Sequence, residues 1–203
     1  MHISEGILSA PVLISGVALT AAGTAIGLKR MEYDRIPEVA LFSAGFFVAS
    51  LIHIPLGPAS AHLILNGLLG LFLGWATFPA ILIGLTLQAV LFQYGGFTSL
   101  GVNCFNMALP GILCHYAFRY GARSQKPALS LSASFLCGFG AVLLGIFMVA
   151  ISLVLTGRSF LDVSKLLLIA HFPVMVVEGI ITLFCVSFIK KVKPELLEEI
   201  YAR

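Results

Sequence analysis

Long apolar stretches with few interruptions dominate the sequence. Residues 6–28, 39–118 and 127–157 contain no Asp, Glu, Lys or Arg, and Glu178 is the one such residue within 166–189. Because a membrane-spanning helix takes about 20 apolar residues, these stretches have room for about one, four, one and one helical spans. The pattern therefore predicts a polytopic membrane protein with about seven spans.

Proline, glycine and charged residues divide the apolar stretches into individual spans. Pro110 predicts a kink within the fifth span, and Ser60 is the expected N-cap of the third. The stretches 61–74 and 138–155 are apolar all round, which is typical of helices and differs from the alternating strands of a membrane barrel. The predicted spans cover residues 10–28, 37–53, 60–75, 79–93, 102–118, 128–156 and 166–189.

The predicted fold class is thus all-α, a single membrane domain over residues 1–203. Within it we expect an N-terminal loop at 1–9, a seven-helix bundle at 10–189 and a cytoplasmic tail at 190–203. The first 28 residues contain no Lys or Arg, so the basic start of a signal peptide is missing. We therefore expect the first span to be retained.

The basic residues predict the orientation of the bundle. Of the 12 Lys and Arg residues, only Arg158 and Lys165 fall in the loop before span seven, and the others follow spans one, five and seven. With seven spans, those three segments share one side of the membrane. Because basic loops stay in the cytoplasm, we expect the N-terminus outside and the C-terminus inside.

The composition excludes several classes of protein. The chain is 59% hydrophobic and only 10% charged, against about 25% charged in a soluble domain. A soluble enzyme, a disordered chain and a disulfide scaffold are therefore excluded, and the net charge of +3 reports topology rather than affinity for nucleic acid. The four cysteines form no CxxC pair and are expected to be small buried residues.

The first two residues suggest a metal chelate. A chain that begins Met1-His2 offers the terminal amine, the His2 amide nitrogen and the His2 imidazole, which close a five-membered and a six-membered ring around one ion. Such fused rings favour a plane, and square-planar nitrogen sites suit Ni²⁺ or Cu²⁺. The alternative for His2 is a solvated histidine near a chain end.

His62 is the preferred fourth donor. In the first turn of the expected third span its imidazole would be kept neutral by the positive helix end, and only the neutral ring binds metal. Asn66 follows four residues later on the same expected helix face and would orient His62. The alternative for His62 is an interfacial histidine that bonds a loop.

Three further polar residues are candidates for supporting this site. His53 would orient a ligand or, as we favour, bond a loop. Asn103 and Asn106 lie three residues apart on the fifth span and would either support the site or bond one helix to another. Glu178, in the middle of the seventh span, is costly at that depth, and we favour a buried hydrogen-bonding role over a proton relay or an ion path.

Several segments resemble the CbiM/NikM family, the substrate-binding membrane subunits of energy-coupling factor (ECF) transporters for cobalt and nickel. They are Met-His-Ile-Ser-Glu-Gly-Ile-Leu-Ser at 1–9, the Gly-Pro-Ala-Ser-Ala-His motif that opens 57–70, the Gly-Gly loop that opens 95–110, and 171–179. The resemblance covers nearly the whole chain. It implies that the N-terminal segment folds back into the bundle, with the Met1 amine, the His2 amide and imidazole, and His62 as metal ligands.

The resemblance also implies a function and partners. The chain would capture Ni²⁺ or Co²⁺ outside a prokaryotic inner (plasma) membrane, without a cofactor and without enzymatic activity of its own. ATP would be hydrolysed by two ATPase subunits that act through a transmembrane coupling (T) subunit, often with a small additional membrane subunit. The sequence has no GxxxxGK[ST] motif, in keeping with this division. The alternatives are an ECF S component for an organic micronutrient such as a vitamin and, less favoured, an intramembrane enzyme.

Overall fold

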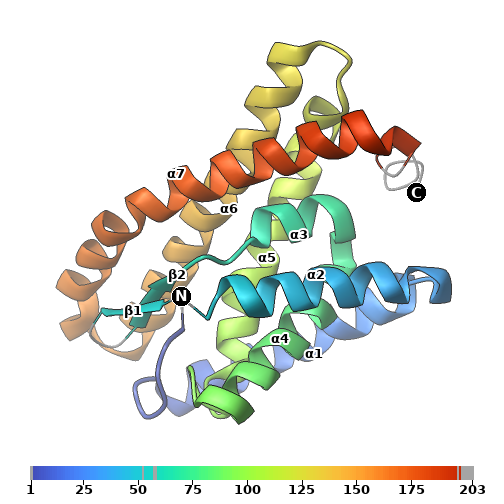
Figure 1. The fold of residues 1–203 in the computed structure, drawn as a ribbon. Helices are drawn as coiled ribbons and strands as arrows, with labels where there is room; N and C mark the ends of the chain where they lie inside the picture. The colour runs from blue at the N-terminus through green and yellow to red at the C-terminus, as the bar shows by residue number, and fades with distance from the viewer. Residues whose placement is uncertain (1, 52, 57–58, 196, 198–203) are drawn as a thin grey trace.

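The computed structural model describes residues 2–51, 53–56, 59–195 and 197, and leaves the side chains of 53–56, 59–61 and 158 undescribed. Helices make up most of the chain, with one small hairpin among them (Figure 1). The elements are α1 (Ala10–Arg30), η1 (Tyr33–Arg35), α2 (Ile36–Ala49), β1 (His53–Leu56), β2 (Ala59–His62), α3 (Asn66–Leu73), η2 (Gly74–Ala76), α4 (Thr77–Phe92), α5 (Leu100–Arg123), α6 (Pro127–Thr156), η3 (Arg158–Phe160) and α7 (Leu161–Val192).

Four helical segments of the described chain are long and apolar enough to cross a membrane. They are Ala10–Arg30, Asn66–Phe92, Pro127–Thr156 and Leu161–Val192. The second joins α3 to α4 through η2, since α3 alone has 8 residues, and α2 has 14. At 1.5 Å per residue, α2 is about 21 Å long, less than the roughly 30 Å of a bilayer core. The structure supports a multi-pass helical protein, and the count of seven spans stays a prediction.

The expectation of a helix over 60–75 is wrong in its first part. Residues 53–56 and 59–62 pair as two antiparallel strands, which we call the hairpin, with His53 opposite His62 and Leu56 opposite Ala59. The helix begins only at Asn66, because Leu65 has a left-handed backbone (φ 54°) that a helix cannot contain. His62 therefore lies in a strand and not in a first helical turn, Ser60 is not a helix N-cap, and the fold is not purely α-helical.

Helix α5 is the central element, and glycines allow its closest contacts. A Cβ atom on Gly70 of α3 would overlap the backbone of Gly111 of α5, so these two helices meet main chain to main chain. A similar contact joins α3 to α6, because a Cβ on Gly67 would lie only 2.7 Å from the Gly138 Cα. The cysteines are free, and Cys104, Cys114 and Cys137 are buried in the core as predicted.

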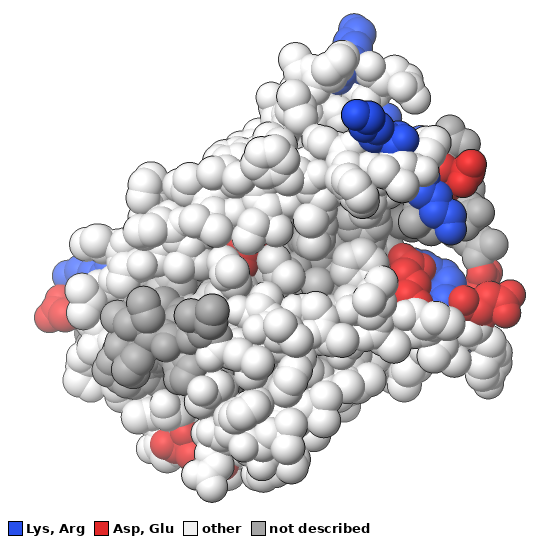
Figure 2. All heavy atoms as spheres, in the orientation of Figure 1, with Lys and Arg blue, Asp and Glu red and all other residues white. Residues whose placement is uncertain are grey.

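The bundle has two chemically distinct ends. The N-terminal loop, the hairpin and the α6–α7 turn lie at one end, and the α1–α2 turn and the end of α7 lie at the other (Figure 1). Charged side chains gather near the ends and leave a largely uncharged band between them on the face shown (Figure 2). Such a band suits the hydrocarbon core of a bilayer.

Candidate metal centre

His2 and His62 meet face to face at the hairpin end of the bundle. Their ring centroids lie 4.5 Å apart with an interplanar angle of 24°, and each residue is only 3% exposed. The Tyr94 ring lies beside His2, with 6.5 Å between centroids. The structure thus brings together the two imidazoles that the sequence suggests as ligands, although 60 positions separate them along the chain.

Asn103 on α5 holds the N-terminal loop in place. Its side-chain amide makes two hydrogen bonds with the backbone of Ile3: the Ile3 N–H donates to Oδ1 at 2.8 Å, and Nδ2 donates to the Ile3 carbonyl at 3.0 Å. Nδ2 also donates to Ser99 Oγ at 3.2 Å. Because Ile3 is fully buried, these two bonds satisfy backbone groups that would otherwise be costly to bury. Asn103 therefore fixes the residue next to His2.

The Gly95–Gly96 loop packs directly against the N-terminal loop. Gly95 has a positive φ of 74°, and a Cβ there would lie 3.3 Å from His2 Nδ1. A Cβ on Gly96 would overlap the Glu5 side chain. Glu5 in turn accepts a hydrogen bond from the Thr98 N–H at 3.0 Å, which lowers the pKa of its carboxyl. No local pattern in the sequence indicates this contact between residues 5 and 98.

The environment of His62 prepares its ring for a metal ion. Burial is the main cause that lowers the pKa of His62 well below its usual 6.5, so the imidazole is neutral. Nδ1 lies 2.7 Å from the Leu63 carbonyl oxygen. Because a carbonyl can only accept, Nδ1 carries the proton in this contact, and Nε2 then carries the lone pair that a metal ion needs.

Glu178 of α7 supports the segment that directly follows His62. Its carboxylate is fully buried and accepts hydrogen bonds from the N–H groups of Ile64 and Leu65, the latter at 2.9 and 3.0 Å to its two oxygens. These bonds stabilise the left-handed turn before α3. The structural role favoured from the sequence agrees with this geometry, but its target, the backbone beside His62, could not be found from the sequence.

The other predicted residues lie in different surroundings. Asn66 Nδ2 donates to the carbonyls of Met107 and Ala141 at 3.1 and 3.2 Å, so it ties α3 to α5 and α6. Asn106 Nδ2 donates to Ser152 Oγ at 3.1 Å and links α5 to α6. His53 pairs with His62 through the hairpin register, and its side chain, like Met1, lies outside the described residues.

The described side chains alone do not form a metal cage. Among them, no group of three or more His, Cys, Asp or Glu residues has the geometry to hold a metal ion. His171 is buried near the site but directs Nδ1 to the Leu167 carbonyl, 2.8 Å away.

Comparison with known proteins assigns the chain to a family. The CbiM family, described as a "Cobalt uptake substrate-specific transmembrane region", matches residues 2–196. The chain belongs to the CbiM family. The match includes His2, the hairpin and Glu178, so the whole site described above lies within the family's transmembrane region.

Individual relatives agree with membership in CbiM. The chain is 46% identical over 202 residues to a Haemophilus influenzae protein named "Putative metal transport protein", with 97% of each chain covered. It is 29% identical to a "Fused nickel transport protein NikMN" of Rhodobacter capsulatus, covering 97% of this chain and 64% of that one. A solved structure described as "Crystal Structure of an transition metal transporter" covers 100% of this CbiM-family chain and 99% of its own chain, at 26% identity and a TM-score of 0.77.

Proposed function

We propose that the chain is the substrate-binding membrane subunit of an ECF-type importer and that it captures Ni²⁺ or Co²⁺ at the hairpin end of the bundle. The observation that carries this proposal is the stacked, buried pair His2 and His62. The membership in CbiM and the names of the relatives support the class of substrate.

The proposed ligands are four nitrogens: the Met1 amine, the His2 amide, the His2 imidazole and the His62 imidazole. The first three come from the consecutive residues Met1 and His2, two of them from the main chain, and close fused chelate rings, which explains why a cluster of three ligating side chains is not required. Four nitrogens in a plane lean toward Ni²⁺. In the described structure Asn103, Glu5 and the Gly95–Gly96 loop hold the His2 segment against the bundle.

The proposed topology places this site outside the cell. The seven-span arrangement puts the hairpin end outside and the basic α1–α2 and α5–α6 turns in the cytoplasm. Inward release would depend on a T subunit, two ATPases and, where present, a small additional membrane subunit. Glu178 gives α7 a direct connection to the backbone beside His62.

A peptide tag placed before Met1 tests the amine ligand. The tag converts the Met1 amine into an amide and moves the free amine away from the site, so we expect high-affinity Ni²⁺ and Co²⁺ binding to be lost. The same tag at the C-terminus is the control and should leave binding intact. Equal binding by both tagged proteins, measured by isothermal titration in detergent, would exclude the Met1 chelate.

Substitution of His62 tests the fourth ligand separately. His62→Ala should weaken metal binding by at least about tenfold, as expected for the loss of one ligand from a transition-metal site. His115→Ala is a matched control, because His115 is also buried but lies on α5 near Leu71, whose carbonyl oxygen is 3.1 Å from its Nδ1. Equal affinities for the two variants would contradict the site. Elemental analysis of protein purified without added metal decides between nickel and cobalt.

A further inference from the structure

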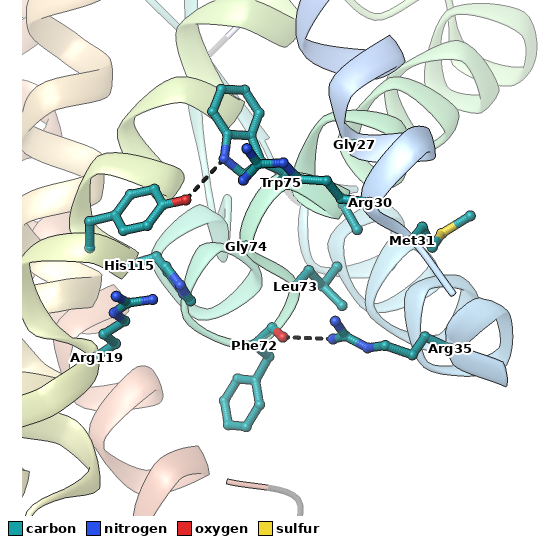
Figure 3. Close-up of a pocket in the computed structure, with 12 residues that line it drawn as sticks. Gly27, Arg30, Met31, Arg35, Phe72, Leu73, Gly74, Trp75, His115 and Arg119 are labelled. Carbon is teal, nitrogen blue, oxygen red and sulfur yellow. Dashed lines mark hydrogen bonds between the residues drawn. The ribbon is translucent and has the colours of Figure 1, made fainter. Parts of the chain in front are cut away.

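A pocket lies at the basic end of the bundle, opposite the end that holds His2 and His62. It encloses about 130 Å³ between the end of α1, the turn η2 and the second half of α5 (Figure 3). Its polar lining comes from Arg30, Arg35, Trp75, His115, Tyr116 and Arg119. The metal site has no part in this pocket, which we call the basic pocket.

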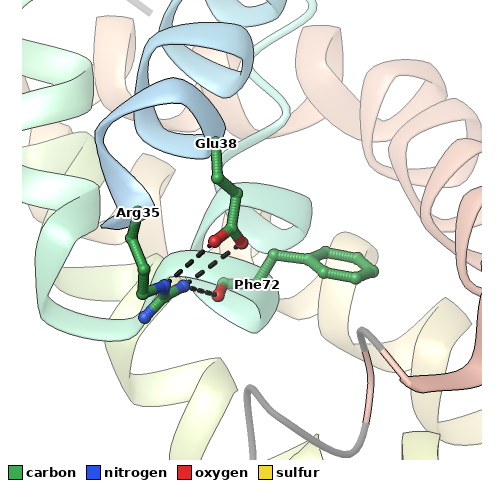
Figure 4. Close-up of polar contacts among 3 residues, drawn as sticks. All are labelled: Arg35, Glu38 and Phe72. Atoms are coloured by element: carbon green, nitrogen blue, oxygen red, sulfur yellow. Dashed lines mark hydrogen bonds and ion pairs between the residues drawn. The ribbon is translucent and has the colours of Figure 1, made fainter. Parts of the chain in front are cut away.

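The basic pocket carries uncompensated positive charge. Arg35 is neutralised by Glu38, at 2.9 Å from Nε to Oε2, and also donates to the Phe72 carbonyl at 3.0 Å (Figure 4). Arg30 and Arg119 have no such ion pair among the described residues, and no Asp or Glu of the described chain lines the pocket. Two guanidinium groups therefore face a space that lacks a counterion.

Aromatic rings hold these guanidinium groups in position. Arg30 lies over the Trp75 ring, 5.5 Å from its centroid, and the Trp75 N–H donates to the Tyr116 hydroxyl at 3.0 Å. Arg119 lies over Tyr116 and Tyr120, at 5.2 and 4.7 Å from the ring centroids. Such stacking orients a guanidinium through its face and leaves N–H groups at its edge for hydrogen bonds, one of which Arg119 Nη2 donates to the Tyr120 hydroxyl at 2.9 Å.

One donor of Arg119 is buried without an acceptor. Its Nε is inaccessible to solvent, and none of the described residues accepts a hydrogen bond from it. Arg119 as a whole is partly exposed, and its Nη2 is the donor already bonded to the Tyr120 hydroxyl. With five N–H donors in all, Arg119 keeps further donors for an anion with several acceptor oxygens. Gly74 also lines the pocket, and its positive φ of 53° favours a residue without a side chain at this wall.

The size of the basic pocket and the surface beside it indicate which kind of anion would fit. Its volume is well below the roughly 300–1,000 Å³ of sites for drug-sized ligands, so it suits a small group such as a phosphate. An exposed face of α5 formed by Leu113, Tyr116 and Tyr120 leads past the pocket, and these side chains are 45–68% exposed. In a membrane this face contacts lipid, and Trp and Tyr gather at the level of lipid headgroups.

We propose that the basic pocket binds the phosphate headgroup of an anionic membrane lipid. Arg30 and Arg119 contribute charge-assisted hydrogen bonds to the phosphate oxygens, and the acyl chains lie along the exposed face of α5. Basic pockets between membrane helices on the cytoplasmic side are suited to such headgroups. The proposal does not depend on the metal site, because the two sites share no residue.

The test compares the full-length protein in nanodiscs of phosphatidylcholine with nanodiscs that also contain phosphatidylglycerol. We expect phosphatidylglycerol to raise the thermal unfolding midpoint and to remain bound in native mass spectrometry. Arg119→Gln and, separately, Arg30→Gln should each weaken this retention about fivefold. Arg123→Gln is the matched control, because Arg123 lies one turn further along α5, is exposed and does not line the pocket.

The outcomes separate the sources of the anion. Retention lost in the pocket variants and kept in Arg123→Gln supports a lipid site. Equal loss in all three variants means a diffuse charge effect and overturns the proposal. So does equal stabilisation by inorganic phosphate in pure phosphatidylcholine, which identifies a soluble anion. Retention of phosphatidylcholine and phosphatidylglycerol in equal amounts also overturns it, and leaves an acidic group of a partner protein as the occupant to be sought.

Discussion

Replacing Asn103 by leucine should separate the docking of the N-terminal loop from the stability of the bundle. Leucine has the same branched arrangement of heavy atoms as asparagine, with two bulkier methyl groups in place of the amide oxygen and nitrogen, and its side chain forms no hydrogen bond. The change leaves the N–H and the carbonyl of Ile3 buried and unpaired. Each such group costs about 1–3 kcal/mol, so we expect the docked loop to lose about 2–6 kcal/mol in total.

This penalty translates into metal affinity. The apparent affinity is the intrinsic affinity multiplied by the fraction of molecules with the loop docked. At 1.4 kcal/mol per factor of ten, a penalty of about 2–6 kcal/mol shifts the docking equilibrium by a factor of about 30 to 20,000. We therefore expect Asn103→Leu to weaken Ni²⁺ binding by at least about tenfold in isothermal titration of the detergent-solubilised protein.

Asn106→Leu is the control for this experiment. Asn106 is equally buried on the same helix, but its amide bonds Ser152 of α6 rather than the N-terminal loop. This variant should lower the thermal unfolding midpoint and leave the metal affinity within about twofold. The reasoning is refuted if Asn103→Leu binds Ni²⁺ as tightly as the unaltered protein, or if both variants lose affinity equally.

Further predictions concern Glu178, Glu5 and the glycine contacts. Glu178→Gln turns an N–H₂ group toward backbone donors and should lower the free energy of unfolding by about 1–3 kcal/mol in urea titration; an unchanged value would contradict the bonds described. The carboxyl of Glu5 has a pKa below 4.5 in the fold, so its stabilisation is complete above that value and is lost as the pH falls through the lowered pKa. Glu5→Gln keeps an acceptor for Thr98 and should show a smaller drop in unfolding midpoint on acidification. Equal drops in the variant and the unaltered protein would contradict a stabilising bond between Glu5 and Thr98. Gly111→Ala should destabilise the bundle by about 1–3 kcal/mol through overlap with α3, whereas Gly45→Ala, which meets no atom within 4 Å, should be neutral or stabilising. Metal affinity should fall from pH 8 to pH 5, because amide and imidazole nitrogens must lose protons to bind; a constant affinity would exclude this set of ligands.

The sequence predicts the long helices well because their signal is local. The expected span at 128–156 agrees with α6 (Pro127–Thr156), and Pro11 and Pro127 lie at helix starts as proline's fixed φ favours. The hairpin was missed because a short apolar run has no period that distinguishes a strand from a buried helix. The start of α3 depends on the left-handed backbone of Leu65, and a leucine gives no sign in the sequence of that conformation.

The candidate site was only partly predictable for a different reason. His2 and His62 are conspicuous because their chemistry is uncommon in an apolar chain. The groups that position them act across long sequence separations: Asn103 on Ile3, and Glu178 on Leu65. Asn103 and Asn106 have the same residue type on the same helix, and only the tertiary contacts assign one to the loop and the other to α6.

The separation of these contacts also sets when the site can come into existence. Ile3 is made 100 residues before Asn103, and a ribosome that adds about 5–20 residues per second needs about 5–20 s to cover that distance. Glu178 follows later still, 113 residues after Leu65. The N-terminal segment can therefore dock only after Asn103 of α5 has been made, and the backbone beside His62 acquires its bonds to Glu178 later still, with α7. A nascent chain that ends before Asn103 would leave the His2 segment undocked, so on the proposed function it could not yet capture a metal ion.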